Sequence, residues 1–280
     1  MGFRPATPCV TGLLALLGLA LAASACSGKG ANSPSGQGAE RQSEAEYDVA
    51  RDLFYKGEAR SALDHVLKAV ELNEDNAEAA YFASTIYLSF CAGDRGLDAP
   101  DCRLTDAERL AKKALKAKSD FRDGKNLLGQ IYILQNRPKE AVAVLEPLTR
   151  DAAYTHSYLA WGNLGWAQVQ AGELDAGITS LKNAVTQPRF CVGHYRLGVA
   201  YEKKQSLDLA EKSFSDALSV DSPDCQALQD AWQGRGRVRL RLGKKDDAKK
   251  DFEKCVSLSK ATQTGRACAH ALTEIPGEKS

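Results

Sequence analysis

The chain has 280 residues, of which 44% are hydrophobic and only 7% are aromatic. Its 37 basic and 36 acidic side chains leave a formal net charge of +1 at pH 7. Because neither sign of charge dominates, the composition excludes a strongly basic nucleic-acid binder and a protein that attracts acidic substrates through its overall charge.

Residues 1–25 have the layout of an export signal. The apolar run from Val10 to Ala23 is shorter than the roughly 20 residues that span a bilayer, and it matches the hydrophobic region of a secretory signal. The segment ends in small residues directly before Cys26, which resembles a bacterial lipobox. The resemblance implies that Cys26 is lipidated and becomes the mature N-terminus. The alternative is an ordinary signal, because Ala23-Ser24-Ala25 also fits the A-x-A cleavage pattern.

Residues 26–42 predict a flexible tether that follows the lipidated cysteine. Gly and Ser are frequent in residues 27–40, and a random coil of this length would span roughly 20 Å. Resemblance to the sorting rule of such lipoproteins implies, from Ser27, a place at the periplasmic face of the outer membrane. We therefore expect a lipid-anchored protein.

Two neighbouring segments of 34 residues each, 158–191 and 191–224, repeat one pattern. Small residues occupy repeat positions 8, 20 and 27, and bulky residues occupy positions 4, 7, 17 and 24. This pattern is typical of a helix–turn–helix unit that stacks on copies of itself, and it resembles the tetratricopeptide repeat (TPR) family. Such stacks bind other proteins in their grooves, so the resemblance implies a binding protein.

The same pattern can be phased along the rest of the chain. We predict an all-α TPR superhelical solenoid over 43–274, with six repeats and a C-terminal capping helix. The repeats are expected at about 43–76, 77–121 with an insertion, 122–155, 158–191, 191–224 and 229–262, and the cap at 263–274.

Six of the eight cysteines lie in the predicted solenoid, and an even number in an exported chain indicates disulfide bonds. Their spacing favours pairing between neighbours in the sequence, although some could instead be free, buried thiols. None shows a zinc-ligand spacing, so no metal site is expected. The cysteines are Cys91, Cys102, Cys191, Cys225, Cys255 and Cys268.

The TPR resemblance implies a partner-binding groove lined by positions 2, 5, 9 and 12 of the first helix of each repeat. Aromatic and aliphatic residues gather there in the N-terminal half, as expected of a surface that binds an amphipathic segment. Phasing errors, or packing of these rings against the N-terminal segment, would remove some of them from the groove. The main candidates are Tyr47, Arg51, Phe54, Tyr81, Leu88, Ile133, Trp166 and Tyr195. Other residues at these positions include Thr85, Asn126, Gln130, Leu159, Val169 and Arg237.

The last repeat is rich in basic residues, including Arg235 and Arg239, which replace the usual leucine and tyrosine at positions 7 and 11. Acidic residues are interleaved with them, which favours a solvated helix face over a contact with anionic lipid or cell-wall polymer. No nucleophile elbow, P-loop or paired His and Cys occurs in the chain. We expect neither an enzyme nor a cofactor or small-molecule substrate, although an enzyme with an unrecognised site remains an alternative.

Lipobox, short tether and six TPR units together resemble the Tgl-like pilotins of type IV pilus secretins. The resemblance covers the whole mature chain but rests on architecture. It implies a protein that binds secretin protomers and promotes their assembly into the outer-membrane ring. The alternative is a TPR lipoprotein scaffold for another envelope complex, such as β-barrel assembly or cell-wall synthesis.

Overall fold

The computed structural model describes residues 36–92 and 96–275, and this part of the chain contains fourteen α-helices and no strand. None of these helices is both long and apolar enough to cross a membrane. The helices are α1 Gly36–Tyr55, α2 Ala59–Leu72, α3 Ala77–Ser89, α4 Leu104–Ala117, α5 Arg122–Leu134, α6 Pro138–Thr149, α7 Ser157–Gln170, α8 Leu174–Ala184, α9 Cys191–Lys203, α10 Leu207–Ser219, α11 Pro223–Gln226, α12 Gln229–Arg241, α13 Lys245–Leu258 and α14 Gln263–Glu274.

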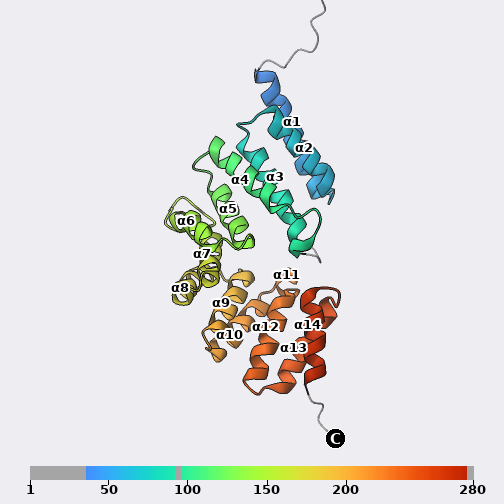
Figure 1. Ribbon diagram of the computed structural model, residues 1–280, viewed down its shortest axis with the longest axis vertical. Coiled ribbons are helices and arrows are strands. Elements are labelled where there is room, and N and C mark those ends of the chain that lie inside the picture. The colour runs from blue at the N-terminus through green and yellow to red at the C-terminus, as the bar shows by residue number, and fades with distance from the viewer. Residues whose placement is uncertain (1–35, 93–95, 276–280) are drawn as a thin grey trace, which may run out of the picture. The chain divides into compact units, whose positions relative to one another are not determined.

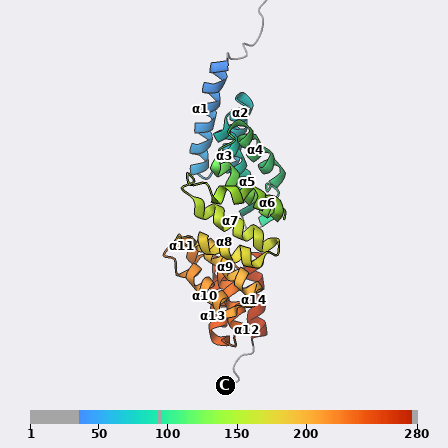
Figure 2. The ribbon, with the colours of Figure 1, turned by 90° about the vertical axis from the view of Figure 1, so that its left-hand side faces the viewer.

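Twelve of these helices form six hairpins that stack in chain order, α1/α2, α3/α4, α5/α6, α7/α8, α9/α10 and α12/α13 (Figures 1 and 2). We call the two helices of each hairpin A and B. The final helix, α14, packs on α13 and α12. This arrangement confirms the predicted all-α TPR fold.

Small residues at repeat position 8 let the A and B helices of a hairpin approach closely. At Gly165 in α7, an added Cβ would lie 2.9 Å from the carbonyl oxygen of Gly177 and 2.7 Å from the side chain of Leu181. At Gly236 in α12, it would lie 2.9 Å from the ring of Phe252. A side chain at Gly165 or Gly236 would therefore displace atoms of the B helix.

The turn between the A and B helices has the same backbone geometry in five repeats. Position 15 is left-handed in each, and glycine reaches this conformation without the Cβ clash that other residues suffer. The φ angles are +82° at Gly57, 57° at Asn136, +88° at Gly172, 63° at Gln205 and +79° at Gly243.

Two features of the fold differ from the sequence-based expectations. Helix α1 begins at Gly36, so residues 36–42 of the predicted tether (26–42) are helical. The short helix α11 fills the insertion before repeat 6. The predicted signal peptide, the lipidation at Cys26 and the remainder of the tether lie outside the described residues.

The basic residues of repeat 6 do not all form the solvated face that their pattern predicts. Arg235 and Arg239 are 13% and 19% exposed and both bind Asp251, which is only 2% exposed. Asp251 Oδ1 accepts from Arg235 Nη2 at 2.7 Å, and its Oδ2 accepts from Arg239 Nη1 at 2.9 Å. The two arginines therefore hold α12 against α13 and are not available to an anionic polymer.

Three disulfide bonds join the six cysteines in the sequential pairing that the spacing favours. Cys91–Cys102 closes the insertion of repeat 2, with 4.6 Å between the Cα atoms. Cys191–Cys225 connects the start of α9 to α11, and Cys255–Cys268 connects α13 to α14. The predicted alternative of free thiols does not hold for these cysteines.

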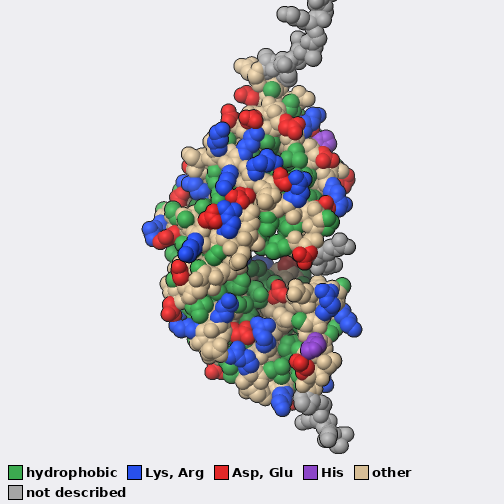
Figure 3. All heavy atoms as spheres, in the orientation of Figure 1, with side chains coloured by type: hydrophobic (Ala, Val, Ile, Leu, Met, Phe, Trp, Pro, Cys, Tyr) green, Lys and Arg blue, Asp and Glu red, His purple; other side chains and the backbone are tan. Residues whose placement is uncertain are grey.

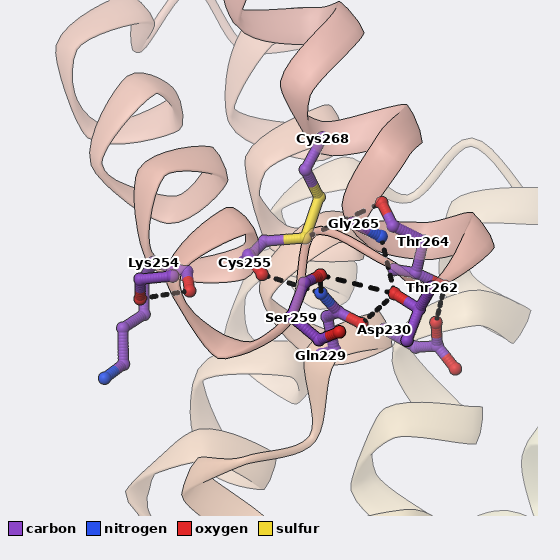
Figure 4. The surroundings of a disulfide bond; sticks show 10 residues. Gln229, Asp230, Lys254, Cys255, Ser259, Thr262, Thr264, Gly265 and Cys268 are labelled. Atoms are coloured by element: carbon purple, nitrogen blue, oxygen red, sulfur yellow. Dashed lines mark hydrogen bonds between the residues drawn. A yellow bond between two sulfur atoms is a disulfide. The ribbon is translucent and has the colours of Figure 1, made fainter. Parts of the chain in front are cut away.

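The side chain of Gln229 positions the capping helix beside the Cys255–Cys268 bond (Figure 4). Its Nε2 donates to the carbonyl oxygens of Cys255 and Ser259 at 2.7 and 2.6 Å. Its Oε1 accepts from Thr262 Oγ1 at 2.6 Å, and that hydroxyl accepts from the backbone N–H of Gly265 at 2.9 Å. The N-cap residue of α14, Thr262, is therefore bonded directly to the first residue of α12.

Candidate protein-binding groove

The A helices α3, α5 and α7 line an open hollow of about 390 Å³. Figure 3 shows one face of the molecule hollowed near its middle, with hydrophobic side chains around the depression. The hollow combines apolar groups with amide, hydroxyl and carboxylate groups, a composition suited to a peptide segment. Its lining residues are Tyr81, Thr85, Leu88, Ser89, Asp123, Asn126, Leu127, Gln130 and Leu159.

Several predicted groove positions therefore meet in one place. Tyr81 and Leu88 line the hollow from α3, while Asn126 and Gln130 line it from α5. Tyr81 is held by the ring of Phe121, 5.0 Å away between centroids, and burial raises the pKa of its hydroxyl. The Tyr81 hydroxyl therefore stays protonated at neutral pH and can donate a hydrogen bond.

The predicted groove residues of α1 have a different environment. The rings of Tyr47 and Phe54 pack edge-on against Phe82 of α3, with centroids 5.8 and 5.4 Å apart. Arg51 is about half exposed and lies 3.7 Å from Asp48. Tyr47 and Phe54 thus help to attach the first hairpin to the second, and neither lines the hollow.

Ile133 is a correction to the predicted groove, because its side chain is only 4% exposed. It lies four residues after Gly129, so both face the partner helix of the hairpin. Val169, which follows Gly165 at the same interval, is likewise buried at 2% exposure. Position 12 therefore belongs to the core in repeats 3 and 4.

Trp166 and Tyr195 are half-buried further along the stack. The guanidinium of Arg196 lies over the ring of Trp166, 5.9 Å from its centroid. The ring of Tyr195 packs against Phe214 at 6.0 Å. Burial, with a smaller contribution from the charge of Asp230, raises the pKa of Tyr195 to about 12.

A chain of polar side chains connects the hollow to Arg196, and the sequence analysis does not identify it. Asn163 Nδ2 donates to Asn126 Oδ1 at 3.0 Å, and Arg196 Nη1 donates to Asn163 Oδ1 at 2.8 Å. Asn163 and Arg196 both occupy repeat position 6, which is not among the expected groove positions. Two polar residues at one otherwise unassigned position are the only signal that could have identified them.

The hollow thus brings apolar, amide, hydroxyl and carboxylate side chains together on one surface. Among the residues that the structure describes, no three His, Cys, Asp or Glu side chains lie close enough together to hold a metal ion.

Comparison with family models identifies several of the repeats. A tetratricopeptide-repeat model matches residues 193–224 and 229–262, and a second one matches 103–154. A search of curated protein sequences found no match.

Solved structures extend the similarity to most of the chain. The chain resembles PilW, described as a widely conserved type IV pilus biogenesis factor, with a TM-score of 0.67 at 19% identity over 81% of this chain and 98% of that one. It resembles PilF of Pseudomonas aeruginosa with a TM-score of 0.63 at 14% identity over 84% and 99%. The similarity to the Cut9–Hcn1 hetero-tetramer of the APC/C has a TM-score of 0.70 at 12% identity and covers 84% of this chain and 43% of that one. The chain thus contains tetratricopeptide repeats and has the all-α fold of a TPR array, and its similarity to the two pilus proteins is one of fold.

Proposed function

We propose that this protein is a non-enzymatic, lipid-anchored TPR scaffold of the pilotin type, which binds secretin protomers and promotes assembly of the outer-membrane secretin of the type IV pilus. The observation that carries the proposal is the fold similarity to PilW and PilF, which covers nearly the whole length of both. The open hollow between α3, α5 and α7 supplies a binding surface.

The proposed mechanism follows from the surface of the hollow. An apolar segment of an unassembled protomer would lie against Tyr81, Leu88 and Leu159 and would be shielded there from aggregation. When protomers pack together, the segment would be buried between them and would leave the scaffold. The scaffold would thus act by holding a partner and undergo no chemical change itself.

The proposed location is the periplasmic face of the outer membrane, with the lipid on Cys26. Three disulfide bonds support an oxidising compartment, because such bonds are rare in the reducing cytosol. The small residues before Cys26 support lipidation. Replacing Cys26 with serine should release the protein from the membrane fraction.

The decisive experiment is deletion of the gene, followed by detection of heat-stable secretin multimers in envelope extracts. The proposal expects the multimers to be lost on deletion and restored by the wild-type protein. Normal multimers after deletion would contradict it and would favour a scaffold for β-barrel assembly or cell-wall synthesis.

The double variant Tyr81→Ala/Leu88→Ala tests the hollow itself. It should fail to restore the multimers while it retains helicity, since both side chains are only half-buried. The matched control is Tyr55→Ala/Leu209→Ala, which removes a tyrosine and a leucine that are 82% and 47% exposed and do not line the hollow. Equal multimer levels from the two variants would show that the partner binds elsewhere.

A further inference from the structure

Arg196 is a half-buried cation that makes no ion pair with any residue that the structure describes. Its Nη1 donates to Asn163 Oδ1 at 2.8 Å and to the carbonyl oxygen of Gly162 at 3.1 Å. Both acceptors are neutral, so the positive charge is not compensated. Burial lowers the pKa of Arg196 to about 10, which still leaves it protonated at neutral pH.

Glu202 of α9 and Asp230 of α12, whose charges act on the adjacent Tyr195, have partners other than Arg196. Glu202 accepts from Arg237 through both oxygens at 2.7 Å each, and Arg241 lies 3.5 Å from one of them. Asp230 accepts from Thr264 Oγ1 at 2.6 Å. A buried charge without a counter-charge is costly, so Arg196 can gain free energy from an anion that a ligand supplies.

Two hydrogen bonds connect Arg196 to the hollow through Asn163. Asn126 lines the hollow, Asn163 binds Asn126, and Arg196 binds Asn163. Leu159 also lines the hollow and lies one helical turn before Asn163 on α7. A segment of a few residues could therefore contact the apolar surface and the guanidinium together.

The hollow is electrically polarised. Asp123 lines it near Tyr81, whose pKa its charge helps to raise, and the same carboxylate accepts from Tyr154 Oη at 3.2 Å. His156 lies 4.0 Å from Asp123. A bound carboxylate would be repelled at the Asp123 end and attracted at the Arg196 end, which gives the segment a direction.

We propose that the groove selects a protein segment in which apolar residues fill the hollow and an adjacent Asp or Glu side chain binds the guanidinium of Arg196 above Trp166. This inference rests on the proposed function, since it specifies the chemistry of the partner segment. The carboxylate gains a charge-assisted hydrogen bond and the apolar side chains leave water.

The test uses purified full-length protein and short fluorescein-labelled synthetic peptides. One peptide has a leucine- and phenylalanine-containing half followed by glutamates, and its counterpart has glutamines in place of the glutamates. Fluorescence anisotropy should show the glutamate peptide binding about tenfold more tightly, as one charge-assisted hydrogen bond implies, and this preference should decrease as salt is added. Equal affinity for the two peptides, or no measurable binding of the glutamate peptide, would overturn the proposal.

Two variants of Arg196 locate the effect. Arg196→Gln should abolish the preference for glutamate and leave affinity for the glutamine peptide nearly unchanged, while Arg196→Lys should keep part of the preference. Arg150→Gln, a change of the same type at a 74% exposed arginine on α6, is the control and should behave as wild type. Circular dichroism reports whether each variant folds. If Arg196→Gln does not fold, loss of the preference in Arg196→Lys would contradict the proposal.

The two proposals can fail separately. If deletion removes the secretin multimers but the peptides bind equally, only the carboxylate preference is wrong. If the preference is present but the multimers survive deletion, the groove binds acidic apolar segments of another partner and the secretin assignment is wrong.

Discussion

Repeats 4 and 6 build the same helix hairpin from different chemistry. In repeat 4, positions 11 and 23 form a neutral hydrogen bond, with Ser180 Oγ donating to Gln168 Oε1 at 2.7 Å. In repeat 6, the same two positions form an ion pair, with Arg239 Nη1 donating to Asp251 Oδ2 at 2.9 Å. The hairpin geometry thus depends on the small residue at position 8, and positions 11 and 23 need only be complementary to each other.

Position 7 extends this difference between the two repeats. Repeat 4 has the buried Leu164, whereas repeat 6 has Arg235, which binds both oxygens of Asp251 at 2.7 and 3.0 Å. Asp251 is therefore bound by two arginines, and Arg239 also binds Glu211 of α10 at 2.9 Å. Repeat 6 uses buried charges where repeat 4 uses apolar packing, and it is correspondingly vulnerable to loss of any one charge.

The largest expected effect is that of Asp251→Asn. Removing the carboxylate that the two arginines share leaves Arg235 without its counter-charge and Arg239 with Glu211 alone, so the free energy of unfolding should fall by about 3 kcal/mol. Urea denaturation measures the change. Ser180→Ala, at the equivalent position of repeat 4, should cost only about 1 kcal/mol. Similar losses in the two variants would show that the ion pairs add nothing beyond a hydrogen bond.

A smaller difference is expected from alanine at position 8. In Gly165→Ala the new Cβ meets the backbone of α8, which cannot move without opening the hairpin, and we expect a loss of about 2 kcal/mol. In Gly236→Ala it meets only the ring of Phe252, and the loss should be about 1 kcal/mol. Thermal unfolding of both variants should show the larger loss of stability for Gly165→Ala, and a larger loss for Gly236→Ala would contradict the prediction.

Acid should weaken repeat 6 before repeat 4. Burial alone would raise the pKa of Glu211, but hydrogen bonds from Lys244 and Arg239 outweigh it and lower the pKa below 4.5. Since the folded pKa lies below the unfolded one, this stabilisation is complete above about pH 4.5 and is lost as the pH falls through the folded value.

Hydrogen exchange at pH 7 and in acid measures this effect by region. The ratio of protection in α12 and α13 to that in α7 and α8 should fall in acid, by an amount equivalent to about 1 kcal/mol. Glu211→Gln should abolish the pH-dependence of this ratio. A ratio that is unchanged between the two pH values in the wild type would contradict the prediction.

The smallest effect is expected at position 15, where the two repeats are alike and repeat 5 differs. Gly172 and Gly243 have positive φ in repeats 4 and 6, whereas repeat 5 places Gln205 there. Gln205→Gly should raise stability by up to about 1 kcal/mol, because the left-handed conformation strains a residue with a Cβ. Gly172→Ala should lower it by about 1 kcal/mol. Calorimetry distinguishes the two directions.

The repeat pattern predicted the hairpins because their spacing depends on local packing rules. The two helices of repeat 4 cross where Gly165 meets Gly177 and Leu181. The order of small and bulky residues in the sequence already predicts this contact. Repeat 6 looks degenerate because Arg235 and Arg239 break the apolar pattern. Only the structure shows that both arginines face Asp251 on the other helix.

The groove could be predicted only in part, because the exposure of an A-helix residue depends on the next hairpin as well as its own. Tyr81 and Leu88 line the hollow as expected of their positions. Tyr47 and Phe54 occupy groove positions too, but their contact with Phe82 depends on how two hairpins stack. The link from Asn163 to Arg196 also crosses between hairpins, so a pattern within one repeat cannot show it.

The disulfide between Cys255 and Cys268 makes the two ends of the array unequal. In a stack whose units contact only their neighbours, melting starts at an end and propagates inward like a zipper. The C-terminal end is held closed because a disulfide bond joins α14 to α13. No disulfide bond joins α1 to its neighbour. Unfolding should therefore start at the N-terminal end. A reductant that cleaves the Cys255–Cys268 bond would allow unfolding to start from both ends.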